Sequence, residues 1–436
     1  MKSAWKYFLV ILVLYLYIHN PYIYFGGMRM GSIKLLYIPT IMFFISKTGK
    51  VKAFIKSFNT EKTVFIIALA YIIFRTLLGG EPLYLWDWIV SFLEVMIVPC
   101  FIIGFMNSSG FGSLESMTRC LLVVGAVATI ISMLCIAFPP INDFVRTYIL
   151  HITSDMRAFE HSFRGFGISE SLSSQYGYVQ GIMVILGMMF LKSNRWFLYF
   201  LPFVLLSAFV NARTGVIVAV VGVVVYLVYN RNYSYSMVII ALSAILVANF
   251  DAVLELVIPN DMTRLWITDF IEQMDAVMVE GVEGSRQTDK LFGQMIILPE
   301  TPEKWIIGRG FNLRANDMGF DNSDVGFIQQ LNYGGIIYVI ILVSLILYAT
   351  LRLFRSKNKL FGFFFLIVFV IINIKTHYLL NSGAFRIMMF TYYVLLLNSK
   401  VDGVNKKLSL LRNRCPNIGF RYLFLFIYCY GYYSNI

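Results

Sequence analysis

Residues 197–229 consist of two apolar runs separated by a short polar turn: FLYFLPFVLLSAFV (197–210), NARTG (211–215) and VIVAVVGVVVYLVY (216–229). Neither apolar run contains a charged residue, and each, with part of the turn, approaches the length of about 20 residues that crosses a bilayer. The turn carries Arg213, a cation that is costly at a membrane face unless an anion balances it. The stretch therefore predicts a helical hairpin in a membrane with a fixed positive charge at its turn.

The same apolar pattern recurs along the whole chain. Of its 436 residues, 58% are hydrophobic and 14% are charged, whereas a soluble domain has about 25% charged residues. The mean hydropathy of +0.73 agrees with this excess of apolar residues. We predict an all-α, polytopic bundle of about twelve membrane-spanning helices. The predicted spans are 5–24, 32–46, 63–79, 88–106, 120–138, 171–191, 195–211, 213–230, 236–257, 325–350, 360–379 and 384–398.

The basic residues are distributed unevenly between the two faces of this predicted bundle. One face would carry the segments 1–6, 47–62, 107–119, 192–195, 230–236, 351–360 and 399–436. These segments contain 21 of the 36 Lys and Arg residues and 3 of the 24 Asp and Glu residues, a charge of +18 that leaves −6 for the rest. Because positive loops remain in the cytoplasm, we expect both termini there. The net charge of +12 then reports topology and not a nucleic-acid partner.

This topology divides the chain into four regions. Spans 1–9 occupy 1–257, and spans 10–12 occupy 325–398. Between them lies a large outward-facing loop, 258–324. A basic cytoplasmic tail follows at 399–436, and its aromatic segment is expected to lie at the membrane interface.

The large loop is expected to contain two amphipathic helices. The first is indicated by apolar residues at helical spacing: Trp266, Phe270, Met274 and Val277. The second would begin at Ser285 and carry Arg286 in its first turn, where a helix N-terminus favours anions. Its apolar face would consist of Leu291, Met295 and Leu298. Arg286 is therefore a candidate anion-binding residue, and the alternative is an ion pair with Asp289 or Glu283.

Four further polar residues are predicted on the outward face. Arg164 precedes the span 171–191, and Arg309 lies between two glycines that permit a tight turn. Asp324 lies where the span 325–350 begins, so it is a candidate proton acceptor or, alternatively, an N-cap. His377, in the turn between the last two spans, is either a functional residue or a plain interfacial histidine.

Several classes of site are not indicated by the sequence. The five cysteines are scattered, which predicts neither a disulfide framework nor a zinc site. No GxxxxGK[ST] motif occurs, and no predicted cytoplasmic segment could form a nucleotide-binding domain. A self-contained ATP-driven pump is therefore excluded, and any catalysis is expected outside or within the membrane.

The order of these features resembles the superfamily of O-antigen polymerases (Wzy-type) and O-antigen ligases. The resemblance covers roughly residues 160–340, and the number of spans extends it to the whole chain. It is carried by Arg-Gly at 164–165, Arg-Thr-Gly at 213–215, Ser-Arg at 285–286, Gly-Arg-Gly-Phe at 308–311, Asp-Asn-Ser-Asp-Val-Gly-Phe at 321–327 and Asn-Tyr-Gly-Gly at 332–335.

The resemblance implies a GT-C-like glycosyltransferase in the bacterial inner membrane. It would join undecaprenyl diphosphate-linked oligosaccharides at the outer face, with inversion of configuration and with neither a metal ion nor another cofactor. Membrane lipid and a chain-length regulator protein are the further partners it suggests. The residues expected to bind the diphosphates are Arg164, Arg213, Arg286 and Arg309, and the proton acceptor would be Asp324 or, in reserve, His377.

Two alternative functions remain open from the sequence. An O-antigen ligase usually has a histidine motif near the end of the long loop, but no histidine occurs between His161 and His377. A flippase for lipid-linked oligosaccharides needs cations in a cavity that opens to both sides in turn. The four candidate arginines are all predicted on one face, which favours the polymerase.

Overall fold

The structure is a computed structural model that describes residues 2–25, 28–151, 164–169, 174–230, 261–265, 268–269, 272, 295–311, 323–356, 358–376 and 382–414. The described part is mostly helical, which confirms the predicted all-α class. Its sheet is a short antiparallel hairpin of β1 (Tyr22–Phe25) and β2 (Met28–Gly31), with Tyr22 opposite Gly31.

The helices follow in an order that matches most of the predicted spans. In the first half they are α1 (Lys2–His19), the 3-10 helix η1 (Ser32–Leu36), α2 (Tyr37–Ser46), α3 (Thr48–Ser57), α4 (Asn59–Leu77), α5 (Leu83–Phe92), the π-helix η2 (Leu93–Ile97), α6 (Val98–Ser108), α7 (Leu114–Ala137), α8 (Pro139–Phe144) and the π-helix η3 (Val145–Ile149). In the second half they are α10 (Ser174–Met189), the 3-10 helix η4 (Arg195–Tyr199), α11 (Leu201–Asn211), α12 (Arg213–Asn230), α17 (Pro302–Ile307), α18 (Gly326–Arg355), α19 (Lys359–Lys375) and α20 (Gly383–Arg414).

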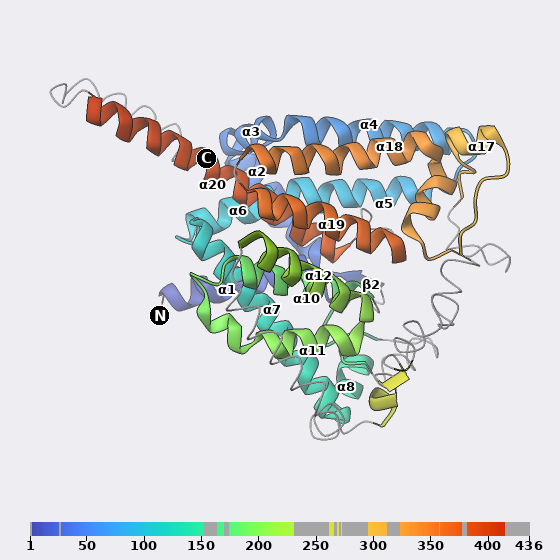
Figure 1. Cartoon of the computed structure of the whole chain (residues 1–436), viewed down its shortest axis with the longest axis horizontal. Coiled ribbons are helices and arrows are strands. Elements are labelled where there is room, and N and C mark those ends of the chain that lie inside the picture. Colours follow the sequence, from blue (N-terminus) through green and yellow to red (C-terminus); the bar gives the residue numbers. More distant parts are fainter. Residues whose placement is uncertain are drawn as a thin grey trace.

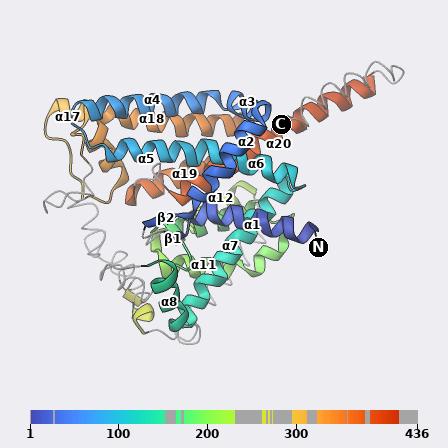
Figure 2. The ribbon, with the colours of Figure 1, turned by 180° about the vertical axis from the view of Figure 1, so that it is seen from behind.

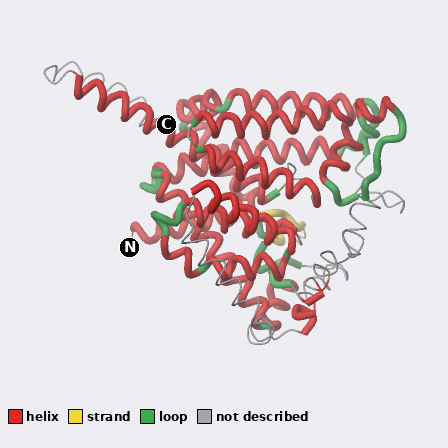
Figure 3. The backbone as a smooth tube through the Cα atoms, in the orientation of Figure 1, coloured by secondary structure: helices red, strands yellow, loops and turns green. Residues whose placement is uncertain are grey.

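The long helices lie side by side and give the bundle two distinct ends (Figure 1). We call the end that carries the β1–β2 hairpin, α8 and α17 the loop end, and the end that carries α3 and the start of α1 the opposite end. Figure 2 shows the same separation from behind, and Figure 3 shows the strands and the described loop residues beside α17 toward the loop end. The described parts of the segments predicted to face outward thus come together at one end of the bundle.

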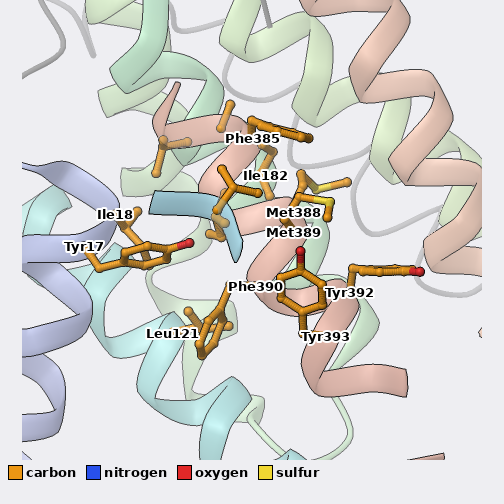
Figure 4. Packing of buried hydrophobic residues seen from close by; sticks show 14 of the residues in the cluster. Tyr17, Ile18, Leu121, Ile182, Phe385, Met388, Met389, Phe390, Tyr392 and Tyr393 are labelled. Atoms are coloured by element: carbon orange, nitrogen blue, oxygen red, sulfur yellow. The ribbon is translucent and has the colours of Figure 1, made fainter. Parts of the chain in front are cut away.

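The first part of α20 forms the centre of the fold. Every residue from Ser382 to Leu396 is buried. This stretch contacts α1, α7, α10, η2 and α18, and Figure 4 shows Phe390 and Met389 among residues of α1, α7 and α10. The helix then continues past the predicted end of the last span, at 398, as far as Arg414.

Two buried ion pairs attach α20 and its neighbours to the N-terminal half of the bundle. Arg386 Nη1 lies 2.7 Å from Glu94 Oε2, and both side chains are almost completely buried. Arg352 Nη1 on α18 lies 2.5 Å from the buried carboxylate of Glu61 on α4, which also accepts a bond from the hydroxyl of Tyr392 on α20. Ionisable groups inside a membrane bundle occur mostly in such pairs.

Three interruptions of the helices have identifiable chemical causes. Helix α1 ends at His19 because the ring of Pro21 disfavours a helical conformation at Asn20, whose φ is 44°. The π-helix η2 precedes Pro99, whose missing N–H cannot continue the α-helical ladder. Helix α18 is kinked at Gly335, whose φ of 66° is readily available to glycine.

The composition of the helices and their surface supports a membrane protein. In the described ranges, three helices are long and apolar enough to cross a membrane: Tyr84–Ser108, Leu114–Ala137 and Gly326–Arg355. Helix α2 exposes Ile38, Met42 and Ile45 at 68%, 65% and 75%, an apolar stripe of the kind that lipid would cover. The number of about twelve spans stays a prediction.

Two differences from the sequence-based boundaries bear on the loop end. The predicted span 5–24 is five residues too long, because the chain leaves the helix at Asn20 and enters β1. The second amphipathic helix cannot include Met295 and Leu298, because 295–300 is not helical. In this segment, Met295 O accepts a hydrogen bond from Ser323 Oγ at 2.6 Å, and Ile297 O accepts one from Asn332 Nδ2 at 2.7 Å.

Some predictions fall on residues that the structure does not describe. They are the span 236–257, most of the first amphipathic helix, the start of the second helix with Arg286, His377 and the aromatic segment of the tail.

The orientation can be tested by cysteine labelling at the two ends. In a chain whose five native cysteines are replaced by alanine, Tyr148→Cys at the loop end should react in intact cells with a membrane-impermeant maleimide. Thr48→Cys, exposed at the opposite end, should react only after the membrane is permeabilised, because of the charge asymmetry. Labelling of Thr48→Cys in intact cells would show that the predicted orientation is wrong and that the opposite end faces outward.

Candidate functional site

Arg164 begins a short segment, residues 164–169, that we call the strap. The carbonyl of Gly165 accepts bonds from the hydroxyl of Ser132 on α7 and, at 3.0 Å, from Asn211 Nδ2 on α11. A Cβ at Gly165 would approach Ile136 Cγ1 to 2.4 Å and Ser132 O to 2.7 Å. Only glycine therefore fits at this contact, which explains why glycine follows the arginine in the Arg-Gly pair.

The turn that contains Arg213 is fixed by equally close packing. A Cβ at Gly215 would lie 2.3 Å from the backbone of Gly177 on α10, and a Cβ at Gly177 would lie 2.6 Å from Ala212 Cβ. Helix α12 begins at Arg213 itself, so the backbone of this residue is set by the contact between α10 and α12. The structure describes this backbone and not the arginine side chain.

Asn211 joins the two arginine motifs. Its side chain is completely buried, and Nδ2 also donates to Ser132 Oγ (3.2 Å) and Ser207 O (2.8 Å). Arg164 adjoins the bonded Gly165, and Arg213 follows Asn211 by at most about 7 Å of chain. Two cations that are 49 positions apart in the sequence are thus brought to neighbouring positions at the loop end.

The junction at Asn211 can be tested by its contribution to stability. We expect Asn211→Leu to lower the free energy of unfolding by about 1–3 kcal/mol, because it leaves buried polar partners without their donor. Asn398→Leu is the matched control, since Asn398 donates only within its own helix, to Val394 O. Thermal unfolding of the purified variants in detergent should rank them in this order, and equal midpoints would contradict the role of Asn211.

The third arginine motif, Gly308-Arg309-Gly310, is bound to the kink in α18. Arg309 N donates to Asn332 O at 2.5 Å, and Gly310 N donates to Tyr333 O at 3.0 Å. Both glycines have positive φ, 77° and 81°, and a Cβ on either would meet backbone or side-chain atoms within 3 Å. The conformation of the turn is therefore coupled to that of the kink through these bonds and close contacts.

Two side chains of α4 hold this turn from its other side. Tyr71 Oη donates to Gly334 O at 2.6 Å, and the buried Arg75 donates through Nη2 to Gly308 O at 3.3 Å. Arg75 was not singled out from the sequence, although a cation near the end of an apolar span is a recognisable signal. Its role is to position the turn that carries Arg309.

The side chain of Arg309 is mostly covered and contacts residues of the large loop. Its Nη2 is 3.5 Å from Glu300 Oε1 and donates to Leu298 O at 3.4 Å. Glu300 also accepts a bond from Lys304 Nζ at 2.9 Å. The hydrogen bond and charge of Lys304, followed by the charge of Arg309, lower the pKa of the Glu300 carboxyl below its usual value. An anionic ligand that binds Arg309 would therefore take the place of the Glu300 carboxylate beside its guanidinium group.

The region around Asp324 answers one of the open alternatives. Helix α18 begins at Gly326 and Val325 occupies its N-cap position, so Asp324 lies one residue before the cap. Ser323 Oγ bonds to Met295 O and accepts from Val325 N at 3.2 Å. Gly326 packs against the backbone of Thr376 at the end of α19. These contacts attach the Asp324 segment to the large loop and α19.

The sequence-based site is thus assembled in part. Arg164 and the backbone of Arg213 are brought together, whereas Arg309 belongs to the separate unit formed by the turn and the kink. Arg286 and His377 lie outside the described residues. Sequence reasoning missed His19, Arg75 and Glu94, and each could have been found as an ionisable residue within or at the end of an apolar run.

Three of the five cysteines belong to the described residues and lie in the core. Cys100, Cys120 and Cys135 are buried and free, as small apolar side chains in a core would be. Cys415 and Cys429 lie outside the described residues. In comparisons with known proteins, no protein-family model matches the chain, and no curated protein matches it.

Proposed function

We propose that this chain is a polysaccharide polymerase that joins lipid diphosphate-linked oligosaccharide repeat units at the outer face of the bacterial inner membrane. The observation that supports the proposal most is the junction at Asn211, which brings the Arg164 and Arg213 motifs together at the loop end. Arginine binds phosphate oxygens through two parallel hydrogen bonds and keeps its charge. Two such cations are suited to one diphosphate.

The chemistry of the proposed reaction requires these cations. A hydroxyl of the acceptor sugar attacks the anomeric carbon of the donor, and the lipid diphosphate leaves as an anion with inversion at that carbon. Negative charge on the leaving group grows in the transition state, so fixed guanidinium groups stabilise that state more than the ground state. Arg164 and Arg213 supply this charge, and Arg286 and Arg309 would contact the second diphosphate.

The polytopic topology fits the location of this reaction. The twelve predicted spans would hold the loop end at the outer face, with both termini in the cytoplasm. The lipid anchor of an undecaprenyl-type substrate would remain in the membrane beside the apolar surface of the bundle. A chain-length regulator protein would be a second partner in the same membrane.

The proposal is tested with purified protein in lipid nanodiscs and a single lipid-linked repeat unit. We expect a ladder of products that differ by one repeat unit, formed without a nucleotide sugar. A single product on a different lipid acceptor would indicate the ligase instead. Movement of intact substrate between leaflets of a vesicle, with no new glycosidic bond, would indicate a transporter.

A further inference from the structure

His19 is a buried histidine whose ring nitrogens have no partner among the described residues. It ends α1 at the loop end, is 2% exposed, and neither Nδ1 nor Nε2 makes a hydrogen bond within that part of the chain. A buried polar group without a partner costs about 1–3 kcal/mol, so native proteins rarely contain one without a reason. The next residue, Asn20, has a positive φ that non-glycine residues seldom adopt.

The surroundings of His19 come from four elements. The ring of Tyr15 lies 4.8 Å away on α1, and the ring of Tyr176 lies 5.9 Å away on α10. Arg386 on α20 donates through Nη2 to Ile18 O at 3.5 Å, and its charge is paired with Glu94 on η2. The imidazole is thus held between two aromatic rings beside an ion pair that is already balanced.

The same contacts connect His19 with the two arginine motifs. Ser169 Oγ, at the end of the strap that begins with Arg164, donates to His19 O at 3.3 Å. Tyr15 Oη donates to Ile168 O, also in the strap, at 3.0 Å. On the other side, Tyr176 contacts His19 and is followed by Gly177, which packs against Ala212 beside Arg213.

Among the described residues, we propose that His19 is the proton acceptor of the reaction, an inference that rests on the proposed function. An imidazole nitrogen removes the hydroxyl proton of the acceptor sugar while that oxygen bonds to the anomeric carbon of the donor. The bond from this carbon to the phosphate oxygen breaks, and its electron pair leaves on the lipid diphosphate. The imidazolium then releases its proton to water, which restores the neutral ring.

This assignment differs from the sequence-based one in a physical respect. Asp324 is joined by its neighbours to the large loop and α19, whereas His19 shares the strap and α10 with Arg164 and Arg213. Because His19 is almost completely covered, the sugar hydroxyl reaches it only when the strap moves away from Tyr15. Hydrogen bonds of catalytic groups are commonly incomplete before substrate binds.

The experiment compares His19→Gln with Asp324→Asn and with the control His151→Gln in the polymerisation assay. His151 is a second histidine at the loop end with positive φ, so its exchange tests the general effect of losing such a side chain. We expect His19→Gln to lower kcat about 100-fold or more while substrate affinity changes less than about twofold. A normal rate for His19→Gln, or a loss confined to Asp324→Asn, overturns the assignment.

The pH profile separates a proton acceptor from a structural histidine. Wild-type kcat should rise with pH along a limb that disappears in His19→Gln. The other ionisable groups packed around the ring are Tyr15, Tyr176, Arg386 and Glu94. The rise of kcat with pH must therefore persist in Tyr15→Phe and in Tyr176→Phe. If the same rise persisted in His19→Gln, it would contradict the proposal.

A second variant covers the case in which His19→Gln does not fold. His19→Ala in the presence of added imidazole should regain activity in proportion to the concentration of the neutral base, whereas His151→Ala should not respond. An absence of rescue in a folded His19→Ala protein overturns the assignment. The proposed function fails separately, when the wild-type chain itself forms no ladder from the lipid-linked repeat unit.

Discussion

Polymerisation should be lost, by about 100-fold to 1,000-fold in kcat, when Arg213 is replaced by alanine. The magnitude is that expected for removing one fixed donor that stabilises developing negative charge. Helix α12 begins at Arg213, and Gly215 two residues later packs on Gly177. The backbone at this position is therefore fixed by helix packing before substrate binds.

Two further variants separate phosphate binding from membrane anchoring. Arg213→Lys should recover only part of the rate, because an ammonium group cannot make two parallel bonds to phosphate oxygens. Arg195→Ala is the control, since Arg195 is an exposed arginine at the start of η4, before α11. Full activity of Arg213→Lys would mean that Arg213 acts only as an interfacial anchor.

Arg386→Leu should be more destabilising than Asn211→Leu, with a loss of about 3–5 kcal/mol in the free energy of unfolding. It would remove the cation that pairs with the buried carboxylate of Glu94, which also accepts a bond from the hydroxyl of Tyr37 at 3.3 Å. The loss would affect the packing of several helices, because α20 lies at the centre of the bundle and contacts its neighbours there. The measurement is the fraction of folded protein recovered from membranes, together with the thermal unfolding midpoint.

The double variant Arg386→Leu with Glu94→Leu shows whether the loss of stability comes from an unpaired buried charge or from the loss of the arginine's shape. If the single substitution destabilises by leaving a charge unpaired, removing the second charge should restore most of the stability, because well-packed apolar residues replace buried pairs at little cost. A double variant as unstable as Arg386→Leu would show instead that the shape of the guanidinium matters. Glu61 and Arg352 offer the same comparison between α4 and α18.

Features that depend on local composition and on the bilayer could be predicted from the sequence. The apolar runs around 197–229 predicted α11, the turn and α12 to within a few residues, because every backbone polar group must be satisfied inside a membrane segment. The alternation of apolar runs and polar loops predicted that successive loops lie at alternate ends, and Figure 1 shows β2, α8 and α17 toward the same end of the bundle. The orientation expected from the asymmetry of Lys and Arg stays a prediction. The glycines beside Arg164, Arg213 and Arg309 marked positions where the backbone is constrained.

The contacts among these residues could not be predicted from the sequence and became visible in the folded chain. Asn211 and Gly165 are 46 positions apart, and Arg75 and Gly308 are 233 apart. No local pattern specifies such pairs, because they arise from the way whole helices pack. At the kink in α18, Gly335 packs against the backbone of Ile306, and the Gly-Arg-Gly turn that follows bonds to Asn332 and Tyr333. At the end of α1, the backbone carbonyl of His19 accepts a bond from Ser169 in the strap. Spacing along the chain predicts elements, whereas helix packing selects the side chains that share a site.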